Sequence, residues 1–313
     1  KPLIPIAGKP IVQRLVEDII KVCEKKVDEI AFVIGDFGKE TEESLVKIAQ
    51  SLGAKGSIYY QDEPLGTAHA ILCAKESLVG NCVVAFADTL FKAEFTLDNT
   101  KDGIIWVSQI DDPSAFGVVK LNAENIITDF VEKPETFVSD LAIIGIYYFN
   151  DGIYLRNELQ YLLDNNIKDK GEFQLTNALE NMKNKGTKFS SGKVREWLDC
   201  GNKDSTVFTN ERILEYSGNL INDSTQIINS EVISPCFIGA NVIIKNSKIR
   251  RPNANNKMRC FFPEILAAIA VKPIERNIAA MPNAKGLTLK LLRILVRLID
   301  FERLVLLDCI GLS

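Results

Sequence analysis

Two aspartates, each at the end of an apolar strand pattern, are the side chains of this 313-residue sequence best suited to chemistry. Asp88 ends the run Val83–Thr89, and Asp199 lies in the run Glu196–Gly201. An acid at the carboxyl end of a parallel strand projects into the crevice where open α/β sheets bind ligands. With Lys133 between them in sequence, the two acids suit a Mg²⁺ ion that handles a phosphorylated substrate. The alternative is that each aspartate caps the helix or turn that follows it.

Two further segments have the composition of binding loops. In Lys1–Ile11 the prolines fix the backbone and Gly8 permits a tight turn, so this loop could hold a lysine at a phosphate or could simply lead into a helix. In the second segment, Gln61 offers an amide donor and acceptor that suit the edge of a pyrimidine base. Gly66 would let the backbone approach a planar ring. The alternative is an ordinary loop with Thr67 as N-cap of the next helix.

Two strand-edge loops, Asp112–Val119 and Phe130–Pro134, complete the candidate binding residues. Glu132 can accept hydrogen bonds from sugar hydroxyls, and Lys133 offers a compact cation to a phosphate. A solvated surface pair is the alternative. The single histidine, His69, falls inside a predicted helix and is expected to pack rather than to catalyse.

Helix and strand patterns alternate up to about Tyr216, which predicts a three-layer α/β sandwich with a mainly parallel sheet. The predicted elements are helices over Ile11–Cys23, Lys39–Leu52 and Thr67–Glu76 and strands over Glu29–Ile34, Gly56–Tyr60 and Cys82–Ala87. Further along the chain the predicted strands are more closely spaced, which suits a set of antiparallel strands that forms one wall of a pocket. These are predicted at Gly103–Ile110, Gly117–Leu121, Ile126–Glu132 and Ala142–Phe149.

From about Asp223 the pattern changes to small aliphatic residues roughly six apart. This hexapeptide pattern stacks as a β-helix, with Gly239 and Asn241 at corners, and a stack this short needs another surface to cap it. The pattern ends near Ile249. Charged residues interrupt the apolar run Leu287–Leu307, which favours an amphipathic helix over a membrane span.

The composition argues against several classes of protein. The net charge is −4 without a basic run, which argues against binding to nucleic acid. Seven cysteines form no C-x-x-C pair and show no zinc-ligand spacing, as in a protein of the reducing cytoplasm. No signal peptide is visible, and because the first residue is Lys1 rather than Met, an upstream segment is expected to be missing.

Taken in order, these segments resemble the sugar-1-phosphate nucleotidylyltransferase family, most closely glucose-1-phosphate thymidylyl- and uridylyltransferases. The motifs are KPLIPIAGKPI, YQDEPLGTAHAI, VVAFADTLF, DPSAFGVV, FVEKP, IIGIYYF and EWLDCGN, between Lys1 and about Ile249. The resemblance implies a Rossmann-like α/β nucleotidyltransferase domain over 1–216. A short left-handed β-helix would follow over 217–249, and then a tail over 250–313 that the resemblance does not assign.

The resemblance also implies an activity: nucleotidyl transfer from dTTP or UTP to glucose 1-phosphate, giving NDP-glucose and pyrophosphate. The partners would be the nucleoside triphosphate and the sugar 1-phosphate, with Mg²⁺ as cofactor and a second copy of the chain as a candidate partner. The catalytic residues would be Lys1 at the triphosphate, Lys133 at the sugar phosphate, and the metal ligands Asp88 and Asp199. The substrate-binding residues would be Gln61, Gly66 and Thr67 on the base side and Gly117, Glu132 and Gly145 in the sugar pocket.

The sequence departs from the family at both ends. The family opens with a central strand and a G-x-G-T-R-L loop that cradles the triphosphate, and neither is present here. We therefore expect the chain as printed to be poorly stable and nearly inactive, with the edges of Glu29–Ile34 and Val83–Ala87 lacking partners.

Two other functions stay open. One is a guanylyltransferase that acts on mannose 1-phosphate, and the other is an inactive nucleotide-sugar-binding or assembly subunit. A dinucleotide-binding oxidoreductase is disfavoured because no G-x-G-x-x-G opens a helix after a strand.

Overall fold

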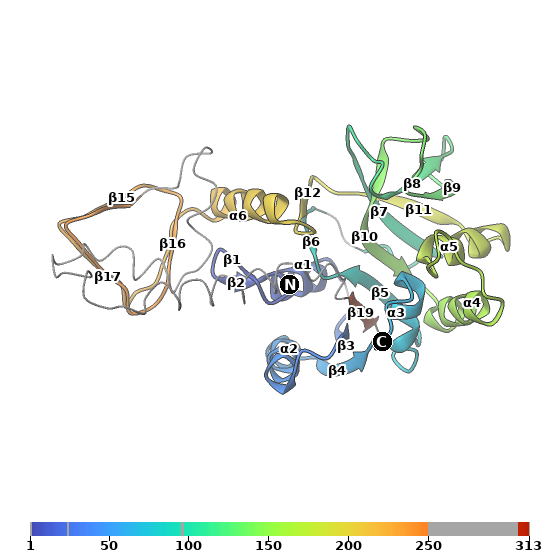
Figure 1. Cartoon of the computed structure of the whole chain (residues 1–313), viewed down its shortest axis with the longest axis horizontal. Coiled ribbons are helices and arrows are strands. Elements are labelled where there is room, and N and C mark those ends of the chain that lie inside the picture. The colour runs from blue at the N-terminus through green and yellow to red at the C-terminus, as the bar shows by residue number, and fades with distance from the viewer. Residues whose placement is uncertain (1, 24, 95–96, 250–305, 313) are drawn as a thin grey trace, which may run out of the picture. The chain divides into compact units, whose positions relative to one another are not determined.

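The computed structural model describes residues 2–23, 25–94 and 97–249 and the backbone of residues 306–312 (Figure 1). The chain divides into two compact units. The larger unit comprises Lys1–Ile4, Pro10–Thr206 and Leu304–Ser313, and the smaller unit comprises Pro5–Lys9 and Val207–Arg303. In the part of the chain that the structure describes, no helix combines the length and apolarity needed to cross a membrane.

A nine-stranded sheet forms the centre of the larger unit, in the order β11-β7-β10-β5-β19-β3-β4. Off this path, β8 pairs with β10, and β9 pairs with β8. Its strands are β3 (Val27–Ile34), β4 (Lys55–Tyr60), β5 (Asn81–Phe86), β7 (Gly103–Gln109), β8 (Gly117–Leu121), β9 (Ile127–Glu132), β10 (Leu141–Phe149), β11 (Phe189–Lys193) and β19 (Leu306–Leu312). The predicted α/β class with a mixed sheet is confirmed, but the prediction of a mainly parallel sheet is wrong. Among the described ladders of this sheet only β3–β4 and β7–β11 are parallel, because β10 and β19 run antiparallel to their neighbours.

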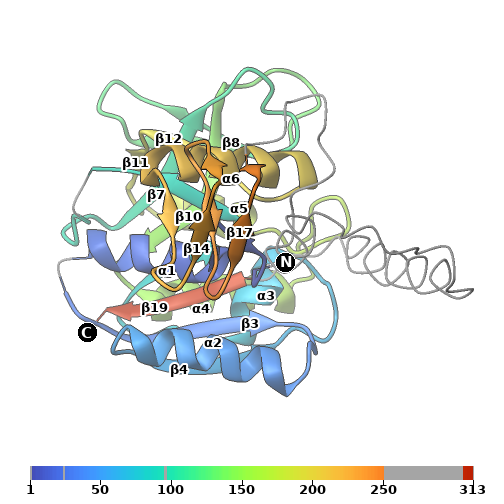
Figure 2. The ribbon, with the colours of Figure 1, turned by 90° about the vertical axis from the view of Figure 1, so that its left-hand side faces the viewer.

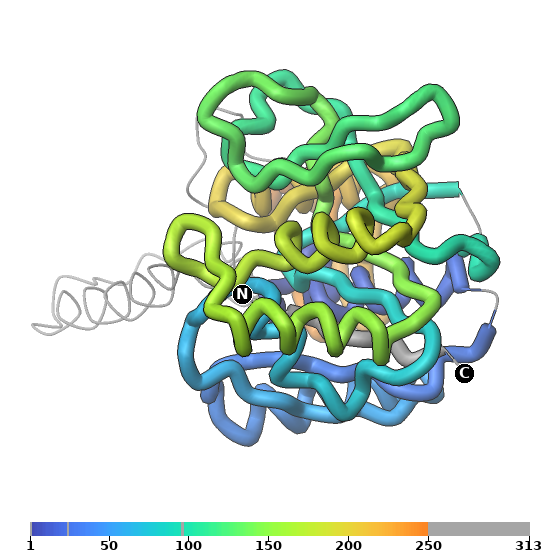
Figure 3. Tube along the Cα trace, turned by 90° about the vertical axis from the view of Figure 1, so that its right-hand side faces the viewer, coloured from blue at the N-terminus to red at the C-terminus, as the bar shows by residue number. Residues whose placement is uncertain are grey.

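Helices cover both faces of this sheet. They are α1 (Ile11–Val22), α2 (Lys39–Ser51), α3 (Thr67–Cys73), α4 (Gly152–Asp164) and α5 (Leu175–Asn184). Alternate residues of β5 face opposite ways: Val83 lines a gap with α1, while Val84 belongs to the core cluster that contains α3, α4 and α5. Figure 3 shows α4 and α5 (yellow-green) side by side. The helices predicted at Ile11, Lys39 and Thr67 all begin at those residues.

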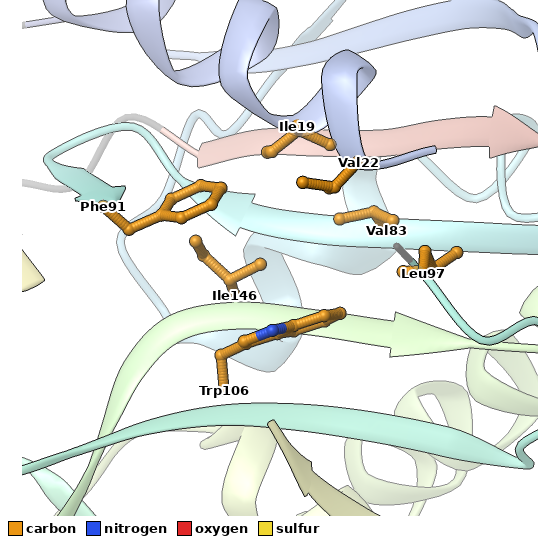
Figure 4. Close-up of a pocket in the computed structure, with 7 residues that line it drawn as sticks. All are labelled: Ile19, Val22, Val83, Phe91, Leu97, Trp106 and Ile146. Atoms are coloured by element: carbon orange, nitrogen blue, oxygen red, sulfur yellow. The ribbon is translucent and has the colours of Figure 1, made fainter. Parts of the chain in front are cut away.

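The apolar gap beside α1 holds about 10 Å³ and is enclosed by seven apolar residues (Figure 4). They are Ile19, Val22, Val83, Phe91, Leu97, Trp106 and Ile146. A gap that is lined by apolar side chains and has room for about one water molecule is a packing void, not a ligand site.

Strand β19 lies between β3 and β5 and pairs with both in antiparallel fashion (Figure 2). Leu307 is opposite Phe32 on β3 and Ala85 on β5. The prediction that these two edges lack partners is therefore wrong, because a segment distant in sequence supplies the main-chain groups. The amphipathic helix predicted over Leu287–Leu307 lies outside the described residues, except for Leu306 and Leu307, which begin β19.

The described part of the smaller unit contains three pairs of short parallel strands. They are β13 (Leu220–Ile221) with β16 (Phe237–Ile238), β14 (Gln226–Ile228) with β17 (Ile243–Lys245), and β15 (Glu231–Val232) with β18 (Lys248–Ile249). Side-chain bonds repeat the same offset: Asn219 to Cys236, Ser224 to Asn241 and Ser230 to Ser247 each join residues 17 apart. One pass of the chain therefore lies on the next at a constant offset.

The smaller unit also contains the tight turn predicted at Gly8. This residue has φ +78° and lies between β1 (Pro5–Ile6) and β2 (Lys9–Pro10). A Cβ at Gly8 would lie 2.0 Å from the ring of Phe237, so glycine is required here for space as well as for conformation.

Candidate active site

The two aspartates predicted to hold a metal are carried by neighbouring segments of the larger unit. Asp88 lies in the turn between β5 and β6 (Thr89–Lys92), and Asp199 is the last residue of β12 (Glu196–Asp199). Strands β6 and β12 form an antiparallel ladder in which Asp199 is opposite Thr89, and the Cys200 N–H donates to the Asp88 carbonyl at 2.7 Å. The backbones of the two acids are therefore adjacent. We had expected both acids to end parallel strands, and this is wrong for both. Strand β12 pairs antiparallel with β6 outside the main sheet, and β5, which precedes Asp88, pairs antiparallel with β10 and β19.

The carboxylate of Asp199 also has a local role. Its Oδ1 accepts a hydrogen bond from the Gly201 N–H at 2.9 Å, so the alternative of a turn-stabilising aspartate holds for one of its oxygens. Within the described ranges, no group of three or more His, Cys, Asp and Glu side chains is arranged to hold a metal. The donor set suits Mg²⁺, which is usually bound by one or two carboxylates together with water and substrate phosphates.

Glu132 and Gly117 face each other across the β8–β9 ladder. A Cβ at Gly117 would lie 3.1 Å from Glu132 Oε2, so a side chain there would crowd the carboxylate. Thr176 donates its hydroxyl to the same oxygen at 3.1 Å. Burial raises the pKa of Glu132, whereas Lys133 and the Thr176 hydroxyl oppose that shift.

Lys133 follows directly, with a backbone conformation that is rare for a residue with a side chain, φ +41°. Two hydrogen bonds fix this backbone: the Lys133 N–H donates to the Phe116 carbonyl at 3.1 Å, and Lys170 Nζ donates to the Lys133 carbonyl at 2.8 Å. Strain that is held by several partners is common at functional sites. The arrangement leaves the Lys133 side chain exposed.

Gly145 has a packing reason of its own. It lies in β10 at φ +82°, where the register with β7 shifts, and a Cβ would come within 2.6 Å of the Phe86 ring. Nearby Tyr147 is buried, and burial followed by the charge of Glu132 raises its pKa. Gly145, two residues before Tyr147, therefore allows close packing against Phe86, and Tyr147 senses the charge of Glu132.

The predicted base-binding residues form a loop with internal bonds. Gln61 Nε2 donates to the Gly66 carbonyl at 3.2 Å and lies 3.2 Å from His69 Nδ1. Burial lowers the pKa of His69, in agreement with a packed, neutral side chain. Thr67 is not an N-cap: it is the first residue of α3, Gly66 precedes it, and the cap makes no side-chain bond. The Thr67 hydroxyl accepts instead from the Leu175 N–H at 2.9 Å.

The segment Lys170–Thr176 was not predicted as part of the site. It runs from the loop after α4 into the first turn of α5 and contacts both loops. Phe173 exchanges main-chain bonds with Leu65 (2.8 Å) and Ala68 (2.9 Å), while Lys170 and Thr176 bond Lys133 and Glu132. The local sequence shows only that polar and apolar residues alternate from Glu172 to Thr176, and this pattern does not identify the distant partners of the segment.

The remaining predicted residue, Lys1, lies outside the described residues. A larger, open depression of about 590 Å³ also contains none of the predicted site residues. It adjoins the start of β5, the start of β7 and the end of β10 and includes Gly80, Asp102 and Asn150.

The sequence signature of the family described as Nucleotidyl transferase matches residues 1–215. The chain belongs to this family. The family predicted from the motifs is thereby confirmed, and the matched residues include every predicted site residue of this nucleotidyl transferase.

Individual proteins agree with this assignment. Over 259 residues the chain is 30% identical to Bifunctional protein GlmU of Methanococcus maripaludis, covering 81% of this chain and 57% of that protein. It is 24% identical over 273 residues to a glucose-1-phosphate thymidylyltransferase of Streptomyces griseus, covering 80% and 74%. The chain spans little more than half the length of the GlmU relatives it matches.

A solved structure supports the fold. UDP-glucose pyrophosphorylase complexed with UDP-glucose superposes with a TM-score of 0.56 at 22% identity, covering 69% of this chain and 90% of that one. At this identity the likeness concerns the fold, which is the α/β nucleotidyltransferase architecture.

Proposed function

We propose that this chain transfers a nucleotidyl group from dTTP or UTP to glucose 1-phosphate, giving NDP-glucose and pyrophosphate. One observation carries the proposal. Within a nucleotidyl transferase domain, the loop of Gln61 and Gly66 and the pair Glu132–Lys133 are bonded to one connecting segment, Lys170–Thr176. These shared bonds support the proposal that a residue set suited to a base and a residue set suited to a sugar phosphate serve one site.

In this proposal the phosphate of the sugar attacks the α-phosphorus of the triphosphate in line, and pyrophosphate leaves. Gln61 would bond the base edge, Glu132 would accept from sugar hydroxyls, and the exposed ammonium of Lys133 would neutralise the sugar phosphate. Most of the rate acceleration would come from holding the two substrates in line and from opposing their negative charge.

Asp88 and Asp199 would hold Mg²⁺, and Lys1 would contact the triphosphate. When bound, the ion supplies positive charge at the phosphates and orients them. The support for this assignment is the donor chemistry of two carboxylates on adjacent backbones, which is the protein contribution that Mg²⁺ sites at phosphates commonly use.

We also propose that residues 217–249 are the first coils of a short left-handed β-helix that follows the catalytic domain 1–216. The parallel pairs with their constant offset support this. We propose a cytoplasmic location as well. The support is that the described cysteines Cys23, Cys73, Cys82, Cys200 and Cys236 are not in disulfides.

The test of the activity is pyrophosphate release with dTTP, UTP or GTP, each combined with glucose 1-phosphate or mannose 1-phosphate, in the presence of Mg²⁺. The proposal predicts the fastest release with glucose 1-phosphate and one of the two pyrimidine nucleotides. Release with GTP and mannose 1-phosphate alone would identify a guanylyltransferase. Binding without release in any combination, including with a family-type G-x-G-T-R-L segment placed before Lys1, would identify an inactive binding subunit.

A further inference from the structure

Thr176 is the first buried polar residue of α5, and it reaches a carboxylate that is 44 residues away in sequence. Its hydroxyl donates to Glu132 Oε2 at 3.1 Å, and only 6% of Thr176 is exposed. A hydroxyl at this depth has little access to water, so its bond to Glu132 is not easily exchanged for a bond to solvent.

The segment that carries Thr176 is fixed at several points. Main-chain bonds join Phe173 to Leu65 and Ala68, and the Thr67 hydroxyl bonds both Leu175 N–H and the Gln174 side chain. A Cβ at Gly66 would lie 2.5 Å from the Phe173 carbonyl, which shows how closely the two backbones pack. Thr176 is therefore presented to Glu132 from an anchored backbone.

We propose that Thr176 is a positioning residue that holds the Glu132 carboxylate in the orientation required for binding a sugar phosphate. The inference rests on the proposed function, because it assigns Glu132 to the sugar. Thr176 contacts Glu132 and not a reacting atom, so it acts through that carboxylate.

The groups around Glu132 affect its pKa, so the proposed role of Thr176 can be measured through that pKa. Lys133, Lys170 and the Thr176 hydroxyl favour its ionised form, whereas burial and Asp169 disfavour it, and Tyr147 packs nearby. Replacing Thr176 with valine keeps the shape of the side chain but removes the donor. The pKa of Glu132 should then rise further, and Thr176→Ser should reverse most of that change.

The experiment uses the full chain and two readouts. Calorimetric titration with glucose 1-phosphate should show about tenfold weaker binding for Thr176→Val at neutral pH and near-native binding for Thr176→Ser. Carboxyl-detected NMR, with Glu132→Gln to assign the signal, should show the raised pKa of Glu132 in Thr176→Val only. Thr128→Val is the matched control, because Thr128 also donates to a carboxylate of β9, that of Asp129 at 2.8 Å, but is exposed. It should change neither readout.

The outcomes separate the two proposals. If the native chain does not bind glucose 1-phosphate but Thr176→Val still raises the pKa of Glu132, the proposed substrate is wrong and the positioning contact stands. If Thr176→Val matches the native chain in both affinity and pKa, the positioning role is refuted. Unequal melting temperatures of the valine and serine variants would identify a folding defect in one of them. The pKa of Glu132 in Thr176→Val and in the native chain would then decide whether Thr176 positions the carboxylate.

Discussion

At the scale of single residues, the site combines groups that are costly for the fold. Glu132 is half-buried, and this burial disfavours its charge; Lys133 has a strained backbone. A Cβ at Gly66 would crowd the Phe173 backbone, and a Cβ at Gly117 would crowd the Glu132 carboxylate. Residues that lower stability without an evident structural benefit are expected at functional positions.

Glu132→Gln should stabilise the fold at neutral pH while it weakens sugar-phosphate binding. Because the folded-state pKa of Glu132 lies above its unfolded value, the native chain loses stability as the pH rises from below the unfolded pKa through the folded pKa. The glutamine variant lacks this loss, so its melting temperature relative to the native chain should increase from pH 4 to pH 8. Glu135→Gln, at an exposed position on the following loop, is the control and should give a constant difference.

Gly66→Ala should be much more destabilising than Gly38→Ala. Both glycines precede a helix at positive φ, +116° and +81°, where alanine costs about 1–3 kcal/mol. Only Gly66 also lacks space, since its Cβ would meet the Phe173 backbone, which should add about 1–3 kcal/mol. Urea unfolding of both variants measures the difference, and equal losses would contradict the close packing at Phe173.

At the scale of elements, the site depends on how α4 and α5 hold the segment between them. Glu158 of α4 is 4% exposed and pairs with Lys185, which follows α5, at 2.6 Å and 2.8 Å. This ion pair joins the middle of α4 to the C-terminal end of α5, whereas Thr176 lies at the N-terminal end of α5.

Lys185→Met should lower the melting temperature clearly, because it leaves the buried Glu158 carboxylate without its partner. The double variant with Glu158→Leu should recover part of the loss. Lys47→Met removes an exposed pair with Glu43 on α2 and should have little effect. Similar shifts in Lys185→Met and Lys47→Met would show that the Glu158 pair is not structurally important.

At the scale of the whole molecule, the central sheet is continuous only through β19. Leu307→Pro removes an N–H from a strand that pairs on both sides and should lower the urea midpoint of the larger unit. Cys309→Pro is the matched control, since Cys309 falls at the register shift in both ladders and should be tolerated better. If both variants unfold at the native midpoint, β19 does not contribute to the sheet.

The sequence predicted elements whose pattern is local. The apolar spacing of Ile11, Leu15 and Ile19 was sufficient for α1, and the apolar run at Glu29–Ile34 was sufficient for β3. Pairing direction was not predictable in β12, because four residues carry no information on which strand lies beside them. Thr176 was missed for the same reason, since its partner Glu132 is distant in the chain.

We propose above all that Asp88, Lys133 and Asp199 serve one nucleotidyl transfer. The most direct test of this proposal follows a label on the α-phosphate of dTTP or UTP, with glucose 1-phosphate and Mg²⁺, using the chain with a family-type G-x-G-T-R-L segment placed before Lys1. We expect the label to move into NDP-glucose with one pyrophosphate released per product. We expect Asp88→Asn, Asp199→Asn and Lys133→Ala each to abolish or strongly slow this transfer. Label that stays in the triphosphate or appears as free nucleoside monophosphate, or transfer that survives all three substitutions, would contradict the proposal.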